Sequence, residues 1–205
     1  MSPTAKATRT NYVLIDYENV QPESLDVLNS EHFRVLVFVG ASQAKVRFDV
    51  ANALQLMRDR AEYIRISGNG SNALDFHIAF HIGELSAKDP TGFFHIVSKD
   101  TGFDPLIQHL KERKIFAGRV KDVVDIHLVK TVHAKSAQDK LEVIASDLRR
   151  RGASKPRAVK TLTSTVAAIF NKKLSSDELD DLVRGLQANG WISVEGTKVS
   201  YSLPG

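Results

Sequence analysis

Short apolar runs that alternate with amphipathic segments fill the first 130 residues and constrain the fold more than any other feature of the chain. Arg34–Val39 is a nearly continuous β-branched run that ends at Gly40, as in a strand buried on both faces. The segment 44–60 instead spaces its apolar residues as one face of a helix does. Such alternation predicts an α/β fold, with a parallel sheet covered by helices.

The same patterns predict the remaining elements of this part. Asn72 and Asp104 are suited to helix N-caps, and Pro105 to a first helical position. The expected strands are Tyr12–Asp16, Arg34–Val39, Tyr63–Ile66, Phe93–Val97 and Ile115–Val120, and the expected helices are 44–60, Leu74–Leu85 and Pro105–Lys111.

The last third of the chain changes character after a polar stretch at His133–Asp139. Ser175 and Glu178 form a capping box, in which each side chain satisfies a free backbone donor at the start of a helix. Helices followed by a hairpin predict a small C-terminal winged helix-turn-helix. We expect helices at Lys140–Arg150, Pro156–Phe170 and Ser175–Gln187, and hairpin strands at Trp191–Val194 and Lys198–Leu203. The expected organisation is a disordered leader at 1–10, a first domain at 11–132, a linker at 133–138 and a winged-helix-like domain at 139–205.

Composition removes several classes of protein and site. The chain of 205 residues has no cysteine, so it forms no disulfide, no thiolate zinc site and no thiol nucleophile, which fits a cytoplasmic location. His77 and His81 have the spacing of a metal pair, but no third soft ligand accompanies them, so we expect them to be structural or exposed. No segment approaches the roughly 18 apolar residues of a membrane span, and no membrane partner is expected.

Three aspartates stand where an α/β fold would bring them together. Asp16 ends one apolar strand, Asp100 follows another through Ser98 and Lys99, and Asp75 lies in the first turn of a helix. Ligands of open α/β sheets collect at the carboxyl ends of the strands. Hard cations such as Mg²⁺ prefer carboxylate and water oxygens. The pattern therefore predicts a metal site at this edge of the sheet.

Segments around these aspartates resemble the PIN-like nuclease superfamily, especially its NYN-type members. The matching segments are Leu14–Val20, Gly70–Phe76 and Val97–Leu106, spread over residues 10–130. The resemblance implies a Rossmann-like parallel sheet flanked by helices. It also implies a nuclease that uses Mg²⁺ or Mn²⁺ to hydrolyse phosphodiester bonds, with RNA the preferred substrate and DNA the second. The C-terminal part of the chain resembles small winged-helix modules that are fused to such nuclease domains.

The resemblance gives catalytic and metal-binding roles to four acids, namely Asp16, Asp75, Asp100 and Asp104. NYN-type members often carry an acid two positions after the aspartate of the fourth strand, where this chain has Gly102. Either Asp104 supplies the fourth carboxylate, or the site has three acids. Three of these acids also have a structural alternative: Asp16 could cap a loop, Asp75 could stabilise the helix dipole at its third position, and Asp104 could be an N-cap.

Neighbouring polar residues are supporting candidates. Asn19 could orient a water or form a turn, and Ser98 could position a water or stabilise the strand end. Lys99 could contact phosphate or be exposed, and Ser42 could touch phosphate or belong to a tight turn. Glu18, two positions after Asp16, could aim at the same acidic cluster, but we expect it to face solvent.

One basic stretch marks the C-terminal part. The net charge of the whole chain is only +4, but Arg149–Lys173 contains no acid, so it could follow a phosphate backbone or simply be a solvated face. The expected helix 175–187 is acidic, which argues against recognition of duplex bases and favours phosphate or single-stranded RNA contact. A protein-binding role is nearly as well supported. The candidate nucleic-acid contacts are Arg149, Arg150, Arg151, Lys155, Arg157, Lys160 and Lys198.

The sequence and this resemblance together predict a metal-dependent ribonuclease or flap-type nuclease, with a C-terminal module that aids nucleic-acid binding. Two rivals remain open, a PIN-like nucleic-acid-binding protein without turnover and a winged-helix regulator of DNA. A third possibility is a scaffold that forms a homodimer through the C-terminal part.

Overall fold

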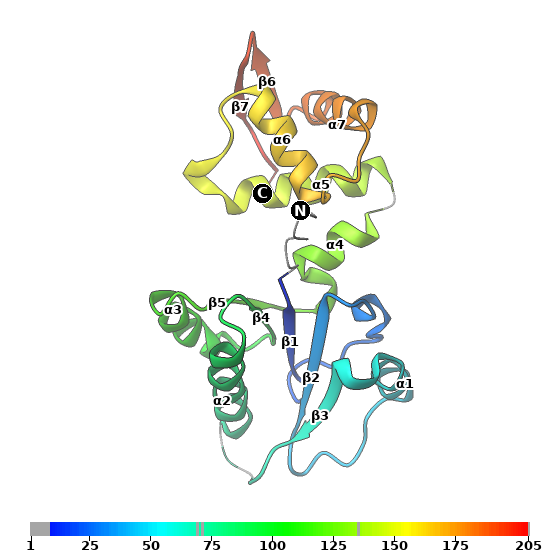
Figure 1. Ribbon diagram of the computed structural model, residues 1–205, viewed down its shortest axis with the longest axis vertical. Coiled ribbons are helices and arrows are strands. Elements are labelled where there is room, and N and C mark those ends of the chain that lie inside the picture. Colours follow the sequence, from blue (N-terminus) through cyan, green and yellow to red (C-terminus); the bar gives the residue numbers. More distant parts are fainter. Residues whose placement is uncertain (1–8, 69, 71, 135, 205) are drawn as a thin grey trace, which may run out of the picture. The chain divides into compact units, whose positions relative to one another are not determined.

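The chain forms two compact units, Met1–Ile126 and His127–Gly205, in the computed structural model, which describes residues 9–68, 70, 72–134 and 136–204 (Figure 1). The leader expected at 1–10 falls almost wholly outside the described residues. The division between the units lies six residues before the expected linker at 133–138, because the helix α4 (His127–His133) packs on α5 (Ala137–Arg150) of the second unit.

The first unit is built on a five-stranded sheet in which every pair of neighbouring strands is parallel. The strand order is β3-β2-β1-β4-β5, so β1 and β4, which carry the aspartate motifs, lie side by side at the centre. The parallel sheet predicted from the apolar runs is confirmed. The strands are β1 (Asn11–Asp16), β2 (Phe33–Val39), β3 (Ala61–Arg65), β4 (Phe93–Val97) and β5 (Phe116–Val120).

Helices cover both faces of this sheet (Figure 1). α2 (Ala73–Lys88) and α3 (Asp104–Glu112) pack on the face that carries Leu14, Phe38 and Ile96. α1 (Phe48–Met57) lies on the other face. Short 3₁₀ helices occupy Asp26–Leu28, Arg58–Arg60, Thr101–Phe103, Val123–Asp125 and Gly152–Ser154.

The predicted bounds of the helix at 44–60 are wrong at both ends. Its helical part begins only at Phe48, and Arg47 has an extended backbone. The Arg47 N–H donates to the Tyr17 hydroxyl at 3.3 Å, so the segment before α1 is tied to the loop after β1. Residues 58–60 form a 3₁₀ turn.

The second unit holds four helices and a two-stranded antiparallel sheet among its described residues. The capping box of Ser175 and Glu178 is confirmed at the start of α7, and Ser136 and Asp139 form another at the start of α5. Ala158 bridges to Lys198 and adds a third extended segment beside β7. Besides α4 and α5, the elements are α6 (Val159–Ile169), α7 (Ser176–Ala188), β6 (Ile192–Glu195) and β7 (Lys198–Tyr201).

Apolar side chains of α5, α6, α7 and the hairpin form the core of this unit. The sequence did not predict α4, whose residues lie just before the polar stretch interpreted as a linker. None of the helices within the described ranges combines the length and the apolar character needed to cross a membrane.

Candidate functional site

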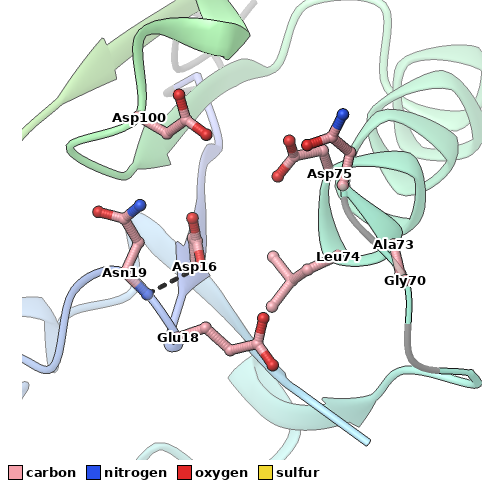
Figure 2. Close-up of a pocket in the computed structure, with 9 residues that line it drawn as sticks. Asp16, Glu18, Asn19, Gly70, Ala73, Leu74, Asp75 and Asp100 are labelled. Atoms are coloured by element: carbon pink, nitrogen blue, oxygen red, sulfur yellow. Dashed lines mark hydrogen bonds between the residues drawn. The ribbon is translucent and has the colours of Figure 1, made fainter.

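The three aspartates singled out in the sequence line one cavity of about 190 Å³ at the carboxyl ends of β1 and β4. Figure 2 shows the carboxylates of Asp16, Asp75 and Asp100 turned toward the same space from three different elements. No lysine, arginine or histidine is among the described residues that line it. The lining residues are Asp16, Glu18, Asn19, Gly70, Asn72, Ala73, Leu74, Asp75 and Asp100.

Asp16 is the most buried of these acids, with 4% of its surface exposed. Its Oδ2 accepts a hydrogen bond from the Ser98 hydroxyl at 2.8 Å, and its Oδ1 accepts one from the Asn19 N–H at 3.2 Å. Burial raises the pKa of Asp16 above its usual value, although both hydrogen bonds act in the opposite direction. The carboxylate is therefore fixed in orientation by two neutral donors and has no cation beside it in the described cavity wall.

Ser98 and Asn19 join the loops that follow β1 and β4. Besides donating to Asp16, the Ser98 Oγ accepts a hydrogen bond from the Asp100 N–H at 3.0 Å. The Asn19 side-chain oxygen accepts one from the Lys99 N–H at 3.2 Å. These contacts hold the backbone of Asp100 in place next to Asp16, so Ser98 and Asn19 position the acids.

Asp75 carries the clearest electrostatic sign of a crowded acidic site. It is the third residue of α2, as expected, although Asn72 at the N-cap makes no side-chain capping bond and has a left-handed backbone with φ of 63°. Burial raises the pKa of Asp75 to about 6, and the nearby charges of Asp16, Asp100 and Glu18 add to the effect. Like charges that are not neutralised by the protein destabilise one another and favour a bound cation.

Asp100 and Glu18 complete the acidic wall. The Asp100 Oδ1 accepts a hydrogen bond from the Gly102 N–H at 2.7 Å, which caps the 3₁₀ helix Thr101–Phe103 and leaves Oδ2 for the cavity. Glu18 is exposed, as expected, but it also lines the cavity. A Cβ atom on Gly40 would lie 1.6 Å from Glu18 Oε1, so the glycine makes room for this carboxylate.

Asp104 is not among the residues that line the cavity. Arg119 of β5 binds its carboxylate through two hydrogen bonds of 2.8 and 3.1 Å, and this pairing lowers the pKa of Asp104. The expectation that Asp104 caps α3 is wrong, because Phe103 occupies the N-cap and Asp104 is the first helical residue. Lys99 and Ser42 are exposed and also lie outside the cavity wall.

Arg119 is the residue of this region that the sequence did not reveal. Its guanidinium also donates to the Ser98 carbonyl oxygen at 3.3 Å, so it supports the strand end that presents Ser98 and Asp100. The hydrogen bond to Asp104 raises the pKa of Arg119. Its only signal in the sequence is a single arginine within the short strand Phe116–Val120.

The donor chemistry of the cavity suits a hard divalent cation, because carboxylate oxygens dominate its polar lining. As placed, no three acid or histidine side chains among the described residues lie close enough to hold one ion together. Mg²⁺ usually keeps several waters and takes only one or two carboxylates directly. The arrangement therefore fits an ion held partly through water, with positions left for a substrate oxygen.

The seven basic residues that the sequence offered as nucleic-acid contacts divide into two groups. Arg149 donates to the Pro204 carbonyl oxygen at 2.7 Å, and Arg150 and Arg151 bind the buried carboxylate of Asp147, so all three hold the unit together. The other four gather where Ala158 pairs with Lys198, and the Lys155 Nζ lies 5.8 Å from the centre of the Tyr201 ring. This second group, called the basic patch below, is Lys155, Arg157, Lys160 and Lys198.

Comparison with known proteins identifies a family for the first unit. A family model described as a PIN domain matches residues 10–120, more than half of the chain, and spans all five strands of the parallel sheet and the whole cavity wall. No curated protein and no solved structure matches the chain significantly.

Proposed function

The chain belongs to the PIN domain family, and from this premise we propose that it is a divalent-metal-dependent nuclease whose preferred substrate is RNA. PIN domains are generally nucleases that need divalent metal ions. The observation that carries the proposal is the cavity in which Asp16, Asp75 and Asp100 meet with no basic residue in the described wall. The NYN-type resemblance of the surrounding segments favours RNA over DNA.

Asp16, Asp75 and Asp100 are the proposed ligands of Mg²⁺ or Mn²⁺. When bound, the ion supplies an activated water and stabilises negative charge on the phosphate oxygens. Ser98 and Asn19 fix Asp16 through its two oxygens, and Ser98 also fixes the backbone of Asp100. Such fixed carboxylates need little rearrangement during the reaction, which is how a preorganised site lowers a barrier.

Ionisation of Asp75 sets a condition on this chemistry. Because burial and the neighbouring carboxylates raise its pKa to about 6, Asp75 is protonated in part of the molecules below that pH when no cation is present. A carboxylate must be deprotonated to bind a metal. We therefore expect metal affinity to rise between about pH 5 and pH 7 and to level off above it.

We also propose that the second unit is a winged-helix module that helps to bind nucleic acid. The order α5, extended Ala158, α6, α7, β6 and β7, with Ala158 paired to β7, supports a winged helix-turn-helix. α7 carries Asp177, Asp180 and Asp181 on its exposed surface, which disfavours its insertion among phosphates. The basic patch beside the hairpin offers the better phosphate contact.

A cleavage assay on labelled single-stranded RNA and DNA tests the nuclease proposal. Wild type is assayed in Mn²⁺, in Mg²⁺ and in EDTA, beside Asp16→Asn and the control Asp49→Asn, an exposed aspartate of α1 that forms an ion pair with the exposed Arg47. We expect metal-dependent cleavage by wild type and Asp49→Asn, none by Asp16→Asn, and faster turnover of RNA than of DNA. Equal rates for wild type and Asp16→Asn would remove Asp16 from the site.

A second candidate function is nucleic-acid binding without turnover. It is favoured by the distances among the acids, since no three of the described side chains gather closely enough to hold an ion as placed. Gly102, which stands where related chains often have an acid, points the same way. RNA binding that persists in EDTA, with no cleavage in any metal, would support this alternative.

A further inference from the structure

The outer face of α2 presents an unusual surface just beyond the carboxylate cavity. Phe76 and Phe80 are 70% and 67% exposed, on successive turns of the helix that also carries Asp75. With His77 and His81 they line an open groove of about 390 Å³. The four rings, Phe76, His77, Phe80 and His81, are called the aromatic face below.

Contacts beneath the aromatic face hold its histidines in one orientation. The His77 Nδ1 donates to the Ala73 carbonyl oxygen at 2.7 Å, and the His81 Nδ1 donates to the His77 carbonyl oxygen at 2.8 Å. The His77 Nε2 faces the Ser67 hydroxyl at 3.4 Å. The His81 ring meets Phe38 of the core edge-on on one side and Phe80 edge-on on the other. The two histidine rings are therefore preorganised, and a ligand that covers them restricts little further freedom of these two side chains.

We propose that the aromatic face stacks the bases of a single-stranded nucleic acid whose backbone runs into the carboxylate cavity. This inference rests on the proposed nuclease function. Exposed aromatic rings are the usual platforms for unpaired bases, because every base has a face that can stack. Residues four apart on a helix lie about 5–6 Å from each other, so Phe76 and Phe80 offer adjacent positions along one strand.

Position on the helix and size distinguish this ligand from a second copy of the chain. Phe76 directly follows Asp75 on α2, so the aromatic face begins on the same turn of the helix that presents Asp75 to the cavity. Two phenylalanines bury about 150–250 Å² each when they are fully covered. Stable protein interfaces bury about 800 Å² on each partner. The aromatic face is too small for such an interface by itself, whereas two exposed rings suit two stacked bases.

The test compares binding and cleavage in the full-length protein. Binding of a labelled single-stranded RNA is measured by fluorescence anisotropy in EDTA, so that no cleavage occurs, and KM and kcat are measured in Mn²⁺. The variants are Phe76→Ala and Phe80→Ala, with Phe76→Leu and Phe80→Leu to keep an apolar side chain without a ring. Leu56→Ala, an exposed apolar residue of α1 on the other face of the sheet, is the control.

We expect each alanine variant to weaken binding by about 5- to 150-fold, the range for loss of one base–aromatic stack. The leucine variants should lose most of the same affinity, and the control Leu56→Ala should lose none. Wild-type affinity and KM in the alanine variants, with normal cleavage, would overturn the inference and leave the nuclease proposal intact. Full binding by the leucine variants would exclude stacking.

Two further outcomes separate the remaining explanations. Wild-type protein that neither binds nor cleaves single strands in any metal would remove the proposed function and this inference with it. Light scattering that shows a wild-type dimer and a monomeric Phe80→Ala would overturn the inference in favour of a second copy of the chain on the aromatic face.

Discussion

Replacing Asp75 by asparagine should stabilise the metal-free protein while it removes a proposed metal ligand. Burial and the charges of Asp16, Asp100 and Glu18 raise the pKa of Asp75 from 3.8 to about 6. At about 1.4 kcal/mol per pH unit, this difference has a ceiling of about 3 kcal/mol. Because Asp75 is partly exposed to solvent, screening reduces the expected gain to about 1–2 kcal/mol.

The sign of the pH dependence follows from proton binding. Between pH 3.8 and about 6 the folded protein keeps a proton on Asp75 that the unfolded chain has already released. The free energy of unfolding of the wild type therefore falls as the pH rises through this window, and the deficit is complete above it. Asp75→Asn has no such deficit. The excess of its free energy of unfolding over that of the wild type should be largest at pH 8. At pH 4.5 this excess should fall to about a third of that value.

Urea denaturation in EDTA at the two pH values measures this difference, with Asp49→Asn as the control. Saturating Mg²⁺ should then raise the thermal midpoint of the wild type but not that of Asp75→Asn, since a bound ligand stabilises only the state that binds it. An Asp75→Asn protein less stable than the wild type at pH 8, or a stability advantage equal at both pH values, would refute the claim that burial and the neighbouring acids raise the pKa of Asp75.

Three other substitutions probe the surroundings of the site and the second unit. Ser98→Ala should lower stability by about 1–3 kcal/mol, because Asp16 loses a donor, and should slow cleavage; unchanged cleavage would show that Ser98 does not position Asp16. Asp104→Asn should keep the cleavage rate within about threefold of the wild type, because Arg119 holds this carboxylate outside the cavity wall. A fall in the cleavage rate as large as that in Asp100→Asn would instead make Asp104 a metal ligand. Asp147→Asn should cost about 1–2 kcal/mol in urea denaturation, a moderate value because its partners Arg150 and Arg151 are partly exposed; no loss would mean that the cluster does not stabilise the second unit.

The sheet could be predicted because its strands are bounded apolar runs. Arg34–Val39 is recognisable from its own residues, and β2 begins only one residue earlier. The carboxyl ends of parallel strands share one edge, which is why the positions of Asp16 and Asp100 at two strand ends were enough to predict that they meet. Asp75 joins them because the helix after β3 starts at the same edge.

Other features depend on contacts between residues far apart in the chain, which periodicity does not report. The pairing of Asp104 with Arg119 joins α3 to β5 and holds this carboxylate outside the described cavity wall. The Tyr17 hydroxyl accepts a hydrogen bond from the Arg47 N–H, just before α1, which begins at Phe48 and not at residue 44 as predicted. Glu18 reaches the cavity wall because Gly40 lacks a Cβ atom. Each of these outcomes depends on tertiary geometry and not on local sequence pattern.

The most direct measurement is the cleavage rate of labelled single-stranded RNA in Mn²⁺ by the wild type and by Asp16→Asn, with equal folding of both shown by circular dichroism. If Asp16, fixed by Ser98 and Asn19, holds the catalytic ion, the rate should fall at least about 100-fold in the variant, and EDTA should abolish wild-type cleavage. Cleavage by Asp16→Asn at the wild-type rate, or wild-type cleavage that continues in EDTA, would contradict the account.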